Sequence, residues 1–357
     1  MFNNLFDIRG KIALVTGGSR GIGEMIAAGF LANGAKVYIS SRKADACAAT
    51  AERLQAAYGG ECIAIPANLA DVEGCQQLAD TLSAREPRLD ILINNAGVSW
   101  GAPLDEFPEL GWDKVMDTNV KGVFFLTQKL LPLLRASGTA ENPARVVNIG
   151  SIDGIKNPVF ETFSYGPSKA ALHHLTRGLA LHLAPQHIIV NAIAPGPFPT
   201  WMLSTGVGGG GDTDIDWSSV ANKNPRGRVG TAENPARVVN VGSIDGIKNP
   251  VFETFSYGPS KAALHHLTRG LALHLAPQHI IVNAIAPGPF PTWMLSTGVG
   301  GGGDTDIDWS SVANNNPRGR VGTAEDIAGL SIFLCSRAGA FTVGEVITCD
   351  GGVAYAT

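Results

Sequence analysis

A tyrosine and a lysine stand one helical turn apart in a segment with a helical pattern. Tyr165 precedes Lys169 by four residues, so both side chains project from one face of the expected helix. An ammonium group beside a phenol favours the phenolate and lowers a pKa that is about 10 in free tyrosine. Tyr165 is therefore a candidate general acid for a reduction and general base for an oxidation. Such a pair alone is more often part of a solvated helix face, so the catalytic interpretation depends on the other motifs around it.

A glycine-rich turn joins the first expected strand, residues 11–16, to the first expected helix, residues 21–33. Small residues at this point let the backbone approach a pyrophosphate held at the helix N-terminus. The spacing Gly-x-x-x-Gly-x-Gly differs from the G-x-G-x-x-G of other dinucleotide folds. The turn predicts a dinucleotide site, and its candidate contacts are Gly17, Ser19, Arg20, Gly21, Ile22 and Gly23.

Charge near the end of the second expected strand favours NADPH over NADH. Residues 40–43 read Ser-Ser-Arg-Lys, which provides Arg42 and Lys43 and no carboxylate, while Arg20 lies in the glycine turn. Guanidinium groups bind a ribose 2′-phosphate, and the acidic residue that holds the ribose in NAD-dependent folds is absent. The alternative is that Arg42 and Lys43 are ordinary solvated residues at the start of a helix.

Four further motifs lie at the ends of expected strands or within an expected helix. Asn-Asn-Ala-Gly at 94–97 ends a strand, Asn119 lies in a long helix, Ser151 follows a strand and Pro195-Gly196 closes another. With the glycine turn and the tyrosine–lysine pair, they closely resemble the short-chain dehydrogenase/reductase family over the whole chain apart from a repeated segment. Within that family, the stretches most similar to the NADPH-dependent 3-oxoacyl reductases are residues 97–101, 141–145 and 165–173.

The resemblance implies a chemistry. A ketone or 3-oxoacyl group of a small carbonyl substrate would be reduced to a secondary alcohol, with NADPH as the hydride donor. Tyr165 would be the proton donor, its pKa lowered by Lys169 and by the positive charge of the oxidised nicotinamide. Ser151 would hydrogen-bond the substrate oxygen, Lys169 would also hold the ribose hydroxyls, and Asn119 would support a water-linked proton path.

The resemblance also implies cofactor contacts outside the glycine turn. They would come from Arg42, Asn68, Leu69, Asn95, Ala96, Gly97, Pro195, Gly196 and Thr200. Asn68 departs from the family pattern, because related sequences usually carry there an Asp that contacts adenine. An amide still donates and accepts hydrogen bonds, so the change affects affinity more than binding itself. Thr200 matches the family residue that contacts the nicotinamide amide.

Strand and helix patterns alternate along the chain. After the first strand, buried strands are expected at residues 36–40, 61–66, 89–94, 145–150, 188–193 and 345–349. Further helices are expected at residues 44–58, 71–84, 112–135, 165–183 and 324–335. Parallel strands covered by helices on both faces follow, so the expected fold class is α/β, a Rossmann-type doubly wound parallel sheet.

Residues 139–230 are repeated almost letter for letter as residues 231–322. The copies differ only at Ile149 against Val241 and at Lys223 against Asn315. Removing one copy would leave 265 of the 357 residues, an ordinary length for one α/β domain. We therefore expect a single Rossmann domain with a duplicated β-α-β-loop segment. Its parts are a dinucleotide-binding half at 1–138, catalytic copies at 139–230 and 231–322, and a completing helix and strand at 323–357.

The site residues of the repeated segment have twins, namely Ser243, Tyr257, Lys261, Pro287, Gly288 and Thr292. The glycine turn and Asn119 are single, so one cofactor site per chain is the limit. Either copy, or a hybrid, could complete the domain while 92 residues loop out, because closing so long a loop costs only about 2–3 kcal/mol more than a short one. The first copy leaves the ribosome earlier, which favours Tyr165.

The surplus copy has further consequences. It would carry apolar strands without neighbours, which predicts a homo-oligomer with segment exchange, or aggregation. It also supports a second hypothesis, a catalytically impaired NADP-binding or assembly protein. The glycine run at 208–211 is either a plain surface loop or a substrate lid. Large side chains that belong either to an apolar pocket or to the core are Trp100, Phe160, Phe163, Trp201 and Met202.

Composition excludes several classes of protein. The chain is 45% hydrophobic with a net charge of −4, so nothing draws it to nucleic acid or to an anionic membrane. It has neither a signal-peptide pattern nor a run of 18 apolar residues, and we expect a cytoplasmic protein. The five scattered cysteines form no C-x-x-C pair, and His173-His174 lacks a carboxylate at ligand spacing, so neither a disulfide nor a metal site is expected.

Overall fold

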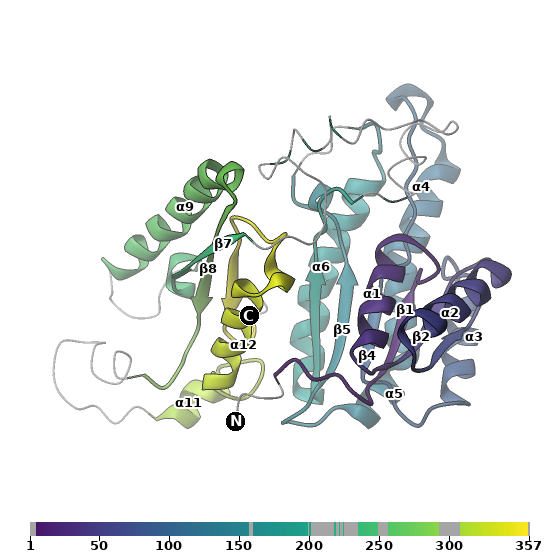
Figure 1. Cartoon of the computed structure of the whole chain (residues 1–357), viewed down its shortest axis with the longest axis horizontal. Helices are drawn as coiled ribbons and strands as arrows, with labels where there is room; N and C mark the ends of the chain where they lie inside the picture. Colours follow the sequence, from purple (N-terminus) through teal and green to yellow (C-terminus); the bar gives the residue numbers. More distant parts are fainter. Residues whose placement is uncertain are drawn as a thin grey trace. The chain divides into compact units, whose positions relative to one another are not determined.

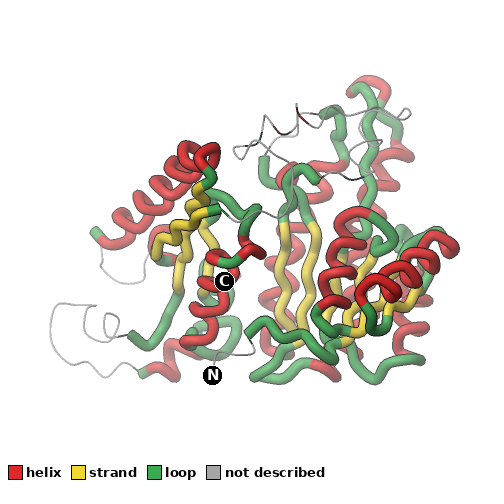
Figure 2. The backbone as a smooth tube through the Cα atoms, in the orientation of Figure 1, coloured by secondary structure: helices red, strands yellow, loops and turns green. Residues whose placement is uncertain are grey.

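The computed structural model describes residues 5–156, 160–198, 200, 218, 221, 224, 235–248, 256–292 and 308–355. The chain forms two compact units (Figure 1). One comprises residues 7–215, and the other comprises residues 216–357 with the first six residues. Each unit has its own parallel sheet with helices packed on it, drawn as yellow strands and red helices in Figure 2.

The first unit contains a six-stranded parallel sheet in the order β3-β2-β1-β4-β5-β6. Its strands are β1 (Ile12–Thr16), β2 (Lys36–Ser40), β3 (Cys62–Ala64), β4 (Ile91–Asn94), β5 (Ala144–Ile149) and β6 (Ile188–Ile193). The strand order reverses between β1 and β4, and ligands of such sheets bind at the carboxyl ends of the strands beside that point. The expected doubly wound parallel sheet is therefore confirmed.

The helices of the first unit follow the expected positions closely. They are α1 (Gly21–Ala32), α2 (Ala44–Tyr58), α3 (Val72–Ser83), α4 (Glu109–Met116), α5 (Gly122–Ser137) and α6 (Tyr165–Leu183). The long helix expected at 112–135 is α4 and α5, joined by a π-helical turn at Asp117–Lys121. Such turns often occur at functional sites, because they release a backbone group from the helical ladder.

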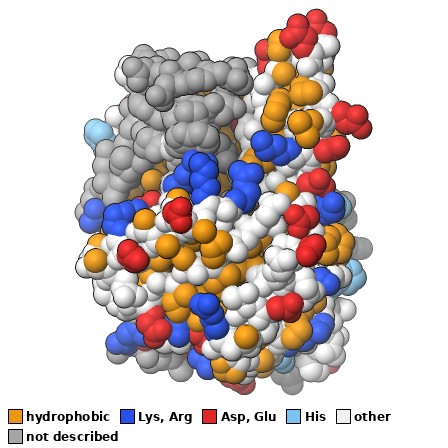
Figure 3. Space-filling model, turned by 90° about the vertical axis from the view of Figure 1, so that its right-hand side faces the viewer, with side chains coloured by type: hydrophobic (Ala, Val, Ile, Leu, Met, Phe, Trp, Pro, Cys, Tyr) orange, Lys and Arg blue, Asp and Glu red, His pale blue; other side chains and the backbone are white. Residues whose placement is uncertain are grey.

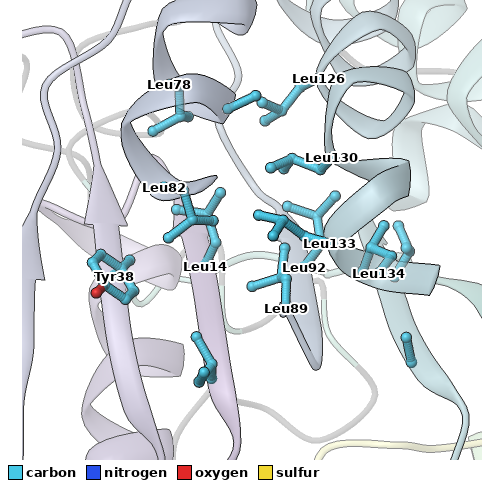
Figure 4. Packing of buried hydrophobic residues seen from close by; sticks show 14 of the residues in the cluster. Leu14, Tyr38, Leu78, Leu82, Leu89, Leu92, Leu126, Leu130, Leu133 and Leu134 are labelled. Atoms are coloured by element: carbon cyan, nitrogen blue, oxygen red, sulfur yellow. The ribbon is translucent and has the colours of Figure 1, made fainter. Parts of the chain in front are cut away.

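The sheet is buried on both faces because successive side chains of a strand point in opposite directions. Ile12 and Leu14 of β1 pack into a cluster with leucines of α3 and α5, which Figure 4 shows from close by. Ala13 and Val15 pack into a second cluster with residues of α1 and α2. Burying each large side chain contributes about 1.5–3 kcal/mol, so these clusters fix the strand ends that carry the site.

The second unit contains a three-stranded parallel sheet in the order β7-β8-β9. Its strands are β7 (Ala236–Val241), β8 (Ile280–Pro287) and β9 (Val346–Cys349), and its helices are α9 (Tyr257–Leu275), α11 (Trp309–Asn314) and α12 (Ala324–Cys335). Helix α12 packs against β7 and β8 and begins with a capping box of Thr323 and Asp326.

The C-terminal strand β9 pairs with β8 of the second copy. From the sequence we expect residues 323–357 to complete a single Rossmann domain with either copy or with a hybrid of the two. In the structure this segment belongs to the second unit, which contains the second copy. Strand β9 follows β8 after roughly 60 residues and β6 after roughly 150, and closing the longer loop costs about 1 kcal/mol more. Because β6 and β8 have the same sequence over six residues, the nearer strand gains the partner.

The surface drawn in Figure 3 mixes basic, acidic and hydrophobic side chains, with one group of Lys and Arg near its middle. This mixture agrees with the small net charge of −4. Of the helices in the described ranges, none combines the length and the apolar character that crossing a bilayer requires.

Candidate active site

The glycine turn after β1 is held in place by the loop after β4. Gly17 has a φ of +64°, and a Cβ there would lie 2.8 Å from Asn95 Nδ2, so only glycine fits. The Asn95 amide donates to the carbonyl oxygens of Thr16 (2.9 Å) and Gly17 (3.2 Å). Thr16 Oγ1 accepts hydrogen bonds from the backbone N–H groups of Asn95 and Ala96, both at 2.9 Å. Residues 16–17 and 95–96 therefore form one rigid corner at the strand ends.

The N-terminus of α1 presents backbone N–H groups toward the turn. Arg20 is the N-cap residue, and its side chain makes no cap hydrogen bond. The turn is also tied to α2, because Thr50 Oγ1 donates to the carbonyl oxygen of Ser19 at 3.0 Å. Gly21 has a φ of +60°, and a Cβ there would lie 3.3 Å from Thr200 Cγ2. The first turn of a twelve-residue helix thus suits an anion, with Thr200 beside it.

Two guanidinium groups lie near each other beside this turn. Burial lowers the pKa of Arg20, and the positive charge of Arg42 lowers it further. Two positive charges close together repel each other, and a phosphate dianion between them would relieve the repulsion. Arg42 follows β2 directly after Ser41, so the pair occupies the edge where a nucleotide ribose would lie in this fold.

Asn68 and Leu69 lie in the segment between β3 and α3. Asn68 is exposed, and its amide donates to Asp71 Oδ2 at 2.8 Å. Asp71 is in turn the N-cap of α3 and accepts from the backbone N–H of Gly74 at 2.6 Å. The Leu69 side chain is buried in the core, so only its backbone could reach a ligand. Asp71 therefore orients the Asn68 amide.

Tyr165 and Lys169 lie at the start of α6, as the spacing predicts. The buried Lys169 Nζ donates to the carbonyl oxygen of Ile149 at 2.7 Å and lies 5.6 Å from the centre of the Tyr165 ring. Burial lowers the pKa of Lys169 to about 8. The pKa of Tyr165 is raised, against the lowering expected from the sequence, because burial outweighs a hydrogen bond from Ser151 that lowers it. The phenol is thus in its protonated form, the one that a general acid needs.

Ser151 follows β5 and meets Tyr165 across the end of the sheet. It is buried, caps the 3-10 turn Ile152–Gly154, and its Oγ accepts from the backbone N–H of Asp153 at 3.1 Å. The backbone N–H of Ile152 donates to the carbonyl oxygen of Pro195 at 3.2 Å. This bond holds the Pro195-Gly196 loop after β6 beside the serine.

Asn119 lies in the π-helical turn and is completely buried. Its Oδ1 accepts from the backbone N–H of Val98, and its Nδ2 donates to the carbonyl oxygen of Val98, both at 2.9 Å. Nδ2 also donates to Ser168 Oγ at 3.0 Å. A Cβ at Gly97 would lie 3.3 Å from Asn119 Oδ1 and 3.5 Å from Lys169 Nζ, so Gly97 sits close to both groups. The side chain of Asn119 thus joins the loop after β4 to α6.

Ser168 belongs to this site, although the motifs of the sequence did not single it out. It is fully buried, accepts from Asn119, and donates from Oγ to the carbonyl oxygen of Tyr165 at 2.7 Å. It therefore couples the first turn of α6 to the π-helical turn. Its position directly before Lys169 could have indicated this role, because a hydroxyl group on the buried face of a helix needs a hydrogen-bond partner.

The proposed pocket residues divide into packed and exposed ones. The Trp100 ring packs on Gly111 of α4, with Lys114 Nζ 5.1 Å from its centre. Phe163 meets Phe107 edge to face at 5.9 Å. Phe160 is exposed. The other expected pocket residues, Trp201 and Met202, and the glycine run at 208–211 lie outside the described residues.

The second unit repeats the tyrosine–lysine pair without the glycine turn. Lys261 Nζ donates to the carbonyl oxygen of Val241 at 3.0 Å and lies 5.4 Å from the centre of the Tyr257 ring. Ser243 caps its own 3-10 turn, as Ser151 does. Residues 17–23 and Asn119 have no twins in the sequence of this unit. The unit therefore reproduces the local geometry of the pair in a sheet that lacks the cofactor corner.

The remaining twins of the cofactor residues lie in a different environment. Pro287 ends β8, and a Cβ at Gly288 would lie 2.6 Å from Asp350 Cβ. The Gly288 backbone N–H donates to the carbonyl oxygen of Cys349 at 3.1 Å, and Thr292 is exposed. The C-terminal segment thus packs against Gly288. In the first copy, a Cβ at Gly196 would meet no described atom within 4 Å, and Thr200 lies beside the glycine turn.

Comparisons with known proteins agree with the geometry. A family model described as short chain dehydrogenase matches residues 11–206, and one described as enoyl-(acyl carrier protein) reductase matches residues 231–354. The rhamnolipids biosynthesis 3-oxoacyl-(acyl-carrier-protein) reductase of Pseudomonas aeruginosa is 53% identical over 231 residues, which are 65% of this chain and 88% of that protein. The 3-oxoacyl-(acyl-carrier-protein) reductase FabG of Aquifex aeolicus is 31% identical over 65% of this chain and 89% of its own length.

Solved structures give the same picture. The Pseudomonas aeruginosa RhlG/NADP active-site complex has a TM-score of 0.51 at 37% identity and covers 99% of both chains. A short chain dehydrogenase of Shigella flexneri complexed with NADP has a TM-score of 0.51 at 31% identity, over 56% of this chain and 83% of its own. The resemblance that the motifs indicated is thereby confirmed.

Proposed function

The chain belongs to the short-chain dehydrogenase family of oxidoreductases, and from this premise we propose that it reduces a ketone or 3-oxoacyl group to a secondary alcohol with NADPH. One observation carries the proposal. Ser151, Tyr165 and Lys169 converge from β5 and α6 at the same sheet end as the glycine turn. Asn119 joins the loop after β4 to α6 there. The first copy, residues 139–230, would thus supply the active site.

The residues at this corner suit a dinucleotide. The N–H groups at the start of α1 would hold the pyrophosphate, Arg20 and Arg42 the 2′-phosphate, and Thr200 the nicotinamide amide. Residues 95–97 and 195–196 would line the nucleotide, and Asn68 with Leu69 would meet the adenine. When bound, the reduced nicotinamide would supply the hydride.

The side chains of the first unit would handle the proton. Tyr165 Oη would donate it to the substrate oxygen as negative charge develops there, because its raised pKa keeps the phenol protonated. Ser151 Oγ would hydrogen-bond the same oxygen. Lys169, with a pKa lowered to about 8, would supply positive charge near the phenol below that pH and hold the ribose. Asn119 would fix the turn through which water reaches the lysine.

The proposed preference for NADPH can be tested by changing the charge beside the glycine turn. We expect NADPH to bind more tightly than NADH, since Arg20 and Arg42 lie close together and the carboxylate at the end of β2 is missing. Arg42→Asp should narrow or reverse the preference, by about tenfold or more for a lost charge-assisted contact. Fluorescence titration measures both affinities. Equal affinities in the parent protein would count against the 2′-phosphate assignment.

The substrate class is tested by turnover. Two relatives are named as 3-oxoacyl-(acyl-carrier-protein) reductases, so 3-oxoacyl thioesters belong in the panel beside simple ketones. The absorbance of NADPH should fall with at least one of them. NADPH binding without turnover of any carbonyl compound would favour the alternative, an NADP-binding or assembly protein whose catalysis the duplication impairs.

A further inference from the structure

A third polar side chain continues the line of Tyr165 and Lys169 along α6. His173 lies one helical turn beyond Lys169, and the mechanism above does not use it. Its ring presses against the residue before the serine, because a Cβ at Gly150 would overlap His173 Nε2. Gly150 can therefore only be glycine while His173 keeps this position.

The imidazole contacts both ends of the turn that carries Ser151. Burial and the charges of Lys169 and Arg177 lower the pKa of His173, while a hydrogen bond to the backbone of Gly154 raises it. The balance is a lowered pKa, so the ring is neutral, with one N–H directed at Gly154. Nε2 is then an acceptor, and it is buried without a hydrogen-bond partner among the described residues.

The second copy shows what such an acceptor can do. His265 occupies the same place, where a Cβ at Gly242 would overlap its Nε2 and one at Gly246 would lie 2.8 Å from its Cε1. There Nε2 accepts a hydrogen bond from the backbone N–H of Ser243 at 3.4 Å. The two copies lie in separate units, so the same arrangement of helix, histidine and serine turn forms twice.

We propose that His173 is a positioning residue for the reduction, and that its imidazole braces the Gly150–Gly154 turn against α6 so that Ser151 Oγ and Tyr165 Oη meet at one substrate oxygen. The proposal rests on the proposed function. Ser151 comes from the end of β5 and Tyr165 from α6, so nothing in either element alone fixes their separation. Catalytic groups need placement within about 0.5 Å, which requires support from behind. The neutral ring supplies this support by donating to the backbone of Gly154 and by packing against Gly150.

The test compares a variant in each copy. His173→Phe keeps a ring of similar size but removes the hydrogen bond to Gly154 and the ring nitrogen beside Gly150, so kcat should fall by about 10- to 100-fold, as for a misplaced catalytic group. The KM for NADPH should stay within about twofold, because the glycine turn is untouched. His265→Phe in the second copy and His174→Ala at the neighbouring position should leave kcat unchanged. An unchanged kcat in His173→Phe would overturn the proposal.

A second variant covers a failure to fold. His173→Asn keeps an N–H near the position of the ring donor, so it should retain the bond to Gly154 and recover part of the lost kcat. If His173→Phe does not fold, the Asn variant is compared with the parent, and a kcat equal to the parent's overturns the proposal. A loss in both variants with a raised KM for NADPH also overturns it, because that pattern indicates general damage rather than positioning.

A measurement without turnover separates this proposal from the function on which it rests. Nuclear magnetic resonance of the protein with nitrogen-15 histidine reports which ring nitrogen of His173 carries the proton, and the signal is assigned by its loss in His173→Asn. A neutral ring protonated on the nitrogen facing Gly154 supports the brace even if no carbonyl compound is reduced, in which case only the proposed function fails. A proton on Nε2, or a charged ring at neutral pH, rules out the acceptor role and the brace with it.

Discussion

Strands β6 and β8 begin with the same six residues and end differently. Strand β6 stops at Ile193, whereas β8 continues for two further residues to Pro287. Ile193 is 53% exposed, and its twin Ile285 is 1% exposed. The difference is β9, which pairs with Ala284 to Pro287 in the second copy. Identical residues thus form the same strand core, and the neighbouring strand decides its length and burial.

The other strand of each copy, β5 or β7, is more buried in the first copy than in the second. Strand β5 pairs with both β4 and β6, and Val146 at its middle is buried. Its twin β7 pairs with β8, and Val238 is exposed. Among the described residues, the first copy is therefore completed on the β4 side and the second on the β9 side. Only the β4 side carries the loop with Asn95 and Gly97, so the two copies differ in the neighbouring loop that they meet rather than in their own residues.

The comparison of the two copies predicts that the paired tyrosines, Tyr165 and Tyr257, differ most in their effect on turnover. Tyr165→Phe removes the proposed acid and should lower turnover by about 10²- to 10⁴-fold, while Tyr257→Phe should leave it nearly intact. Steady-state oxidation of NADPH with an active carbonyl substrate measures both. Comparable partial losses from the two single changes would indicate that each copy completes the site in part of the molecules. Full activity in the double variant would remove tyrosine from the mechanism.

Deleting residues 231–322 should abolish the difference between β6 and β8. The C-terminal segment then follows the first copy directly, and β9 can pair with β6 in the register that it has with β8. The backbone N–H of Ala192 should then bond as Ala284 does to Glu345, so its hydrogen exchange should slow by about 100-fold or more. Activity should be retained. Unchanged exchange at Ala192, or an unfolded protein, would mean that the second copy is needed for the native core.

Truncating the paired isoleucines should affect stability unequally. Ile285→Ala removes a buried side chain and should lower the free energy of unfolding of its unit by about 2–5 kcal/mol. Ile193→Ala removes an exposed one and should cost less than about 0.5 kcal/mol. Urea unfolding followed by circular dichroism compares the two variants. Equal losses would show that β6 has a partner strand in solution.

Lys169 should make the stability of the first unit depend on pH. The folded pKa of Lys169 is about 8, against 10.5 for the unconstrained side chain, so the unfolded chain binds the proton more tightly. Stability should therefore rise as pH increases from about 8 to about 10.5, and below pH 8 the buried charge should cost roughly 3 kcal/mol. Lys169→Met should remove this rise, and Lys261→Met should leave it in place. Thermal unfolding between pH 7 and 10 provides the measurement, and a rise that survives Lys169→Met would contradict the assignment.

Local patterns sufficed to predict the sheet and the residues at its carboxyl ends. The spacing of Tyr165 and Lys169 specified a shared helix face, and the glycine turn specified the strand-to-helix corner beside it. The π-helical turn at Asn119 and the role of Ser168 could not be predicted, because both depend on hydrogen bonds between segments far apart in the chain. The partner of β9 could not be predicted either. Two identical strands present the same surface to it, and only the length of the intervening chain separates them.

One of the two positions where the copies differ lies at the acceptor of the lysine. Lys169 donates to the carbonyl oxygen of Ile149 and Lys261 to that of Val241, so the contact is made through the main chain and does not depend on the side chain. Ile149 is 5% exposed and Val241 is 60% exposed. The smaller residue thus stands in the copy where a missing methylene leaves no cavity. The side chain at this position can therefore lose a methylene at little cost in the second copy, while the main-chain hydrogen bond that holds the lysine is kept in both.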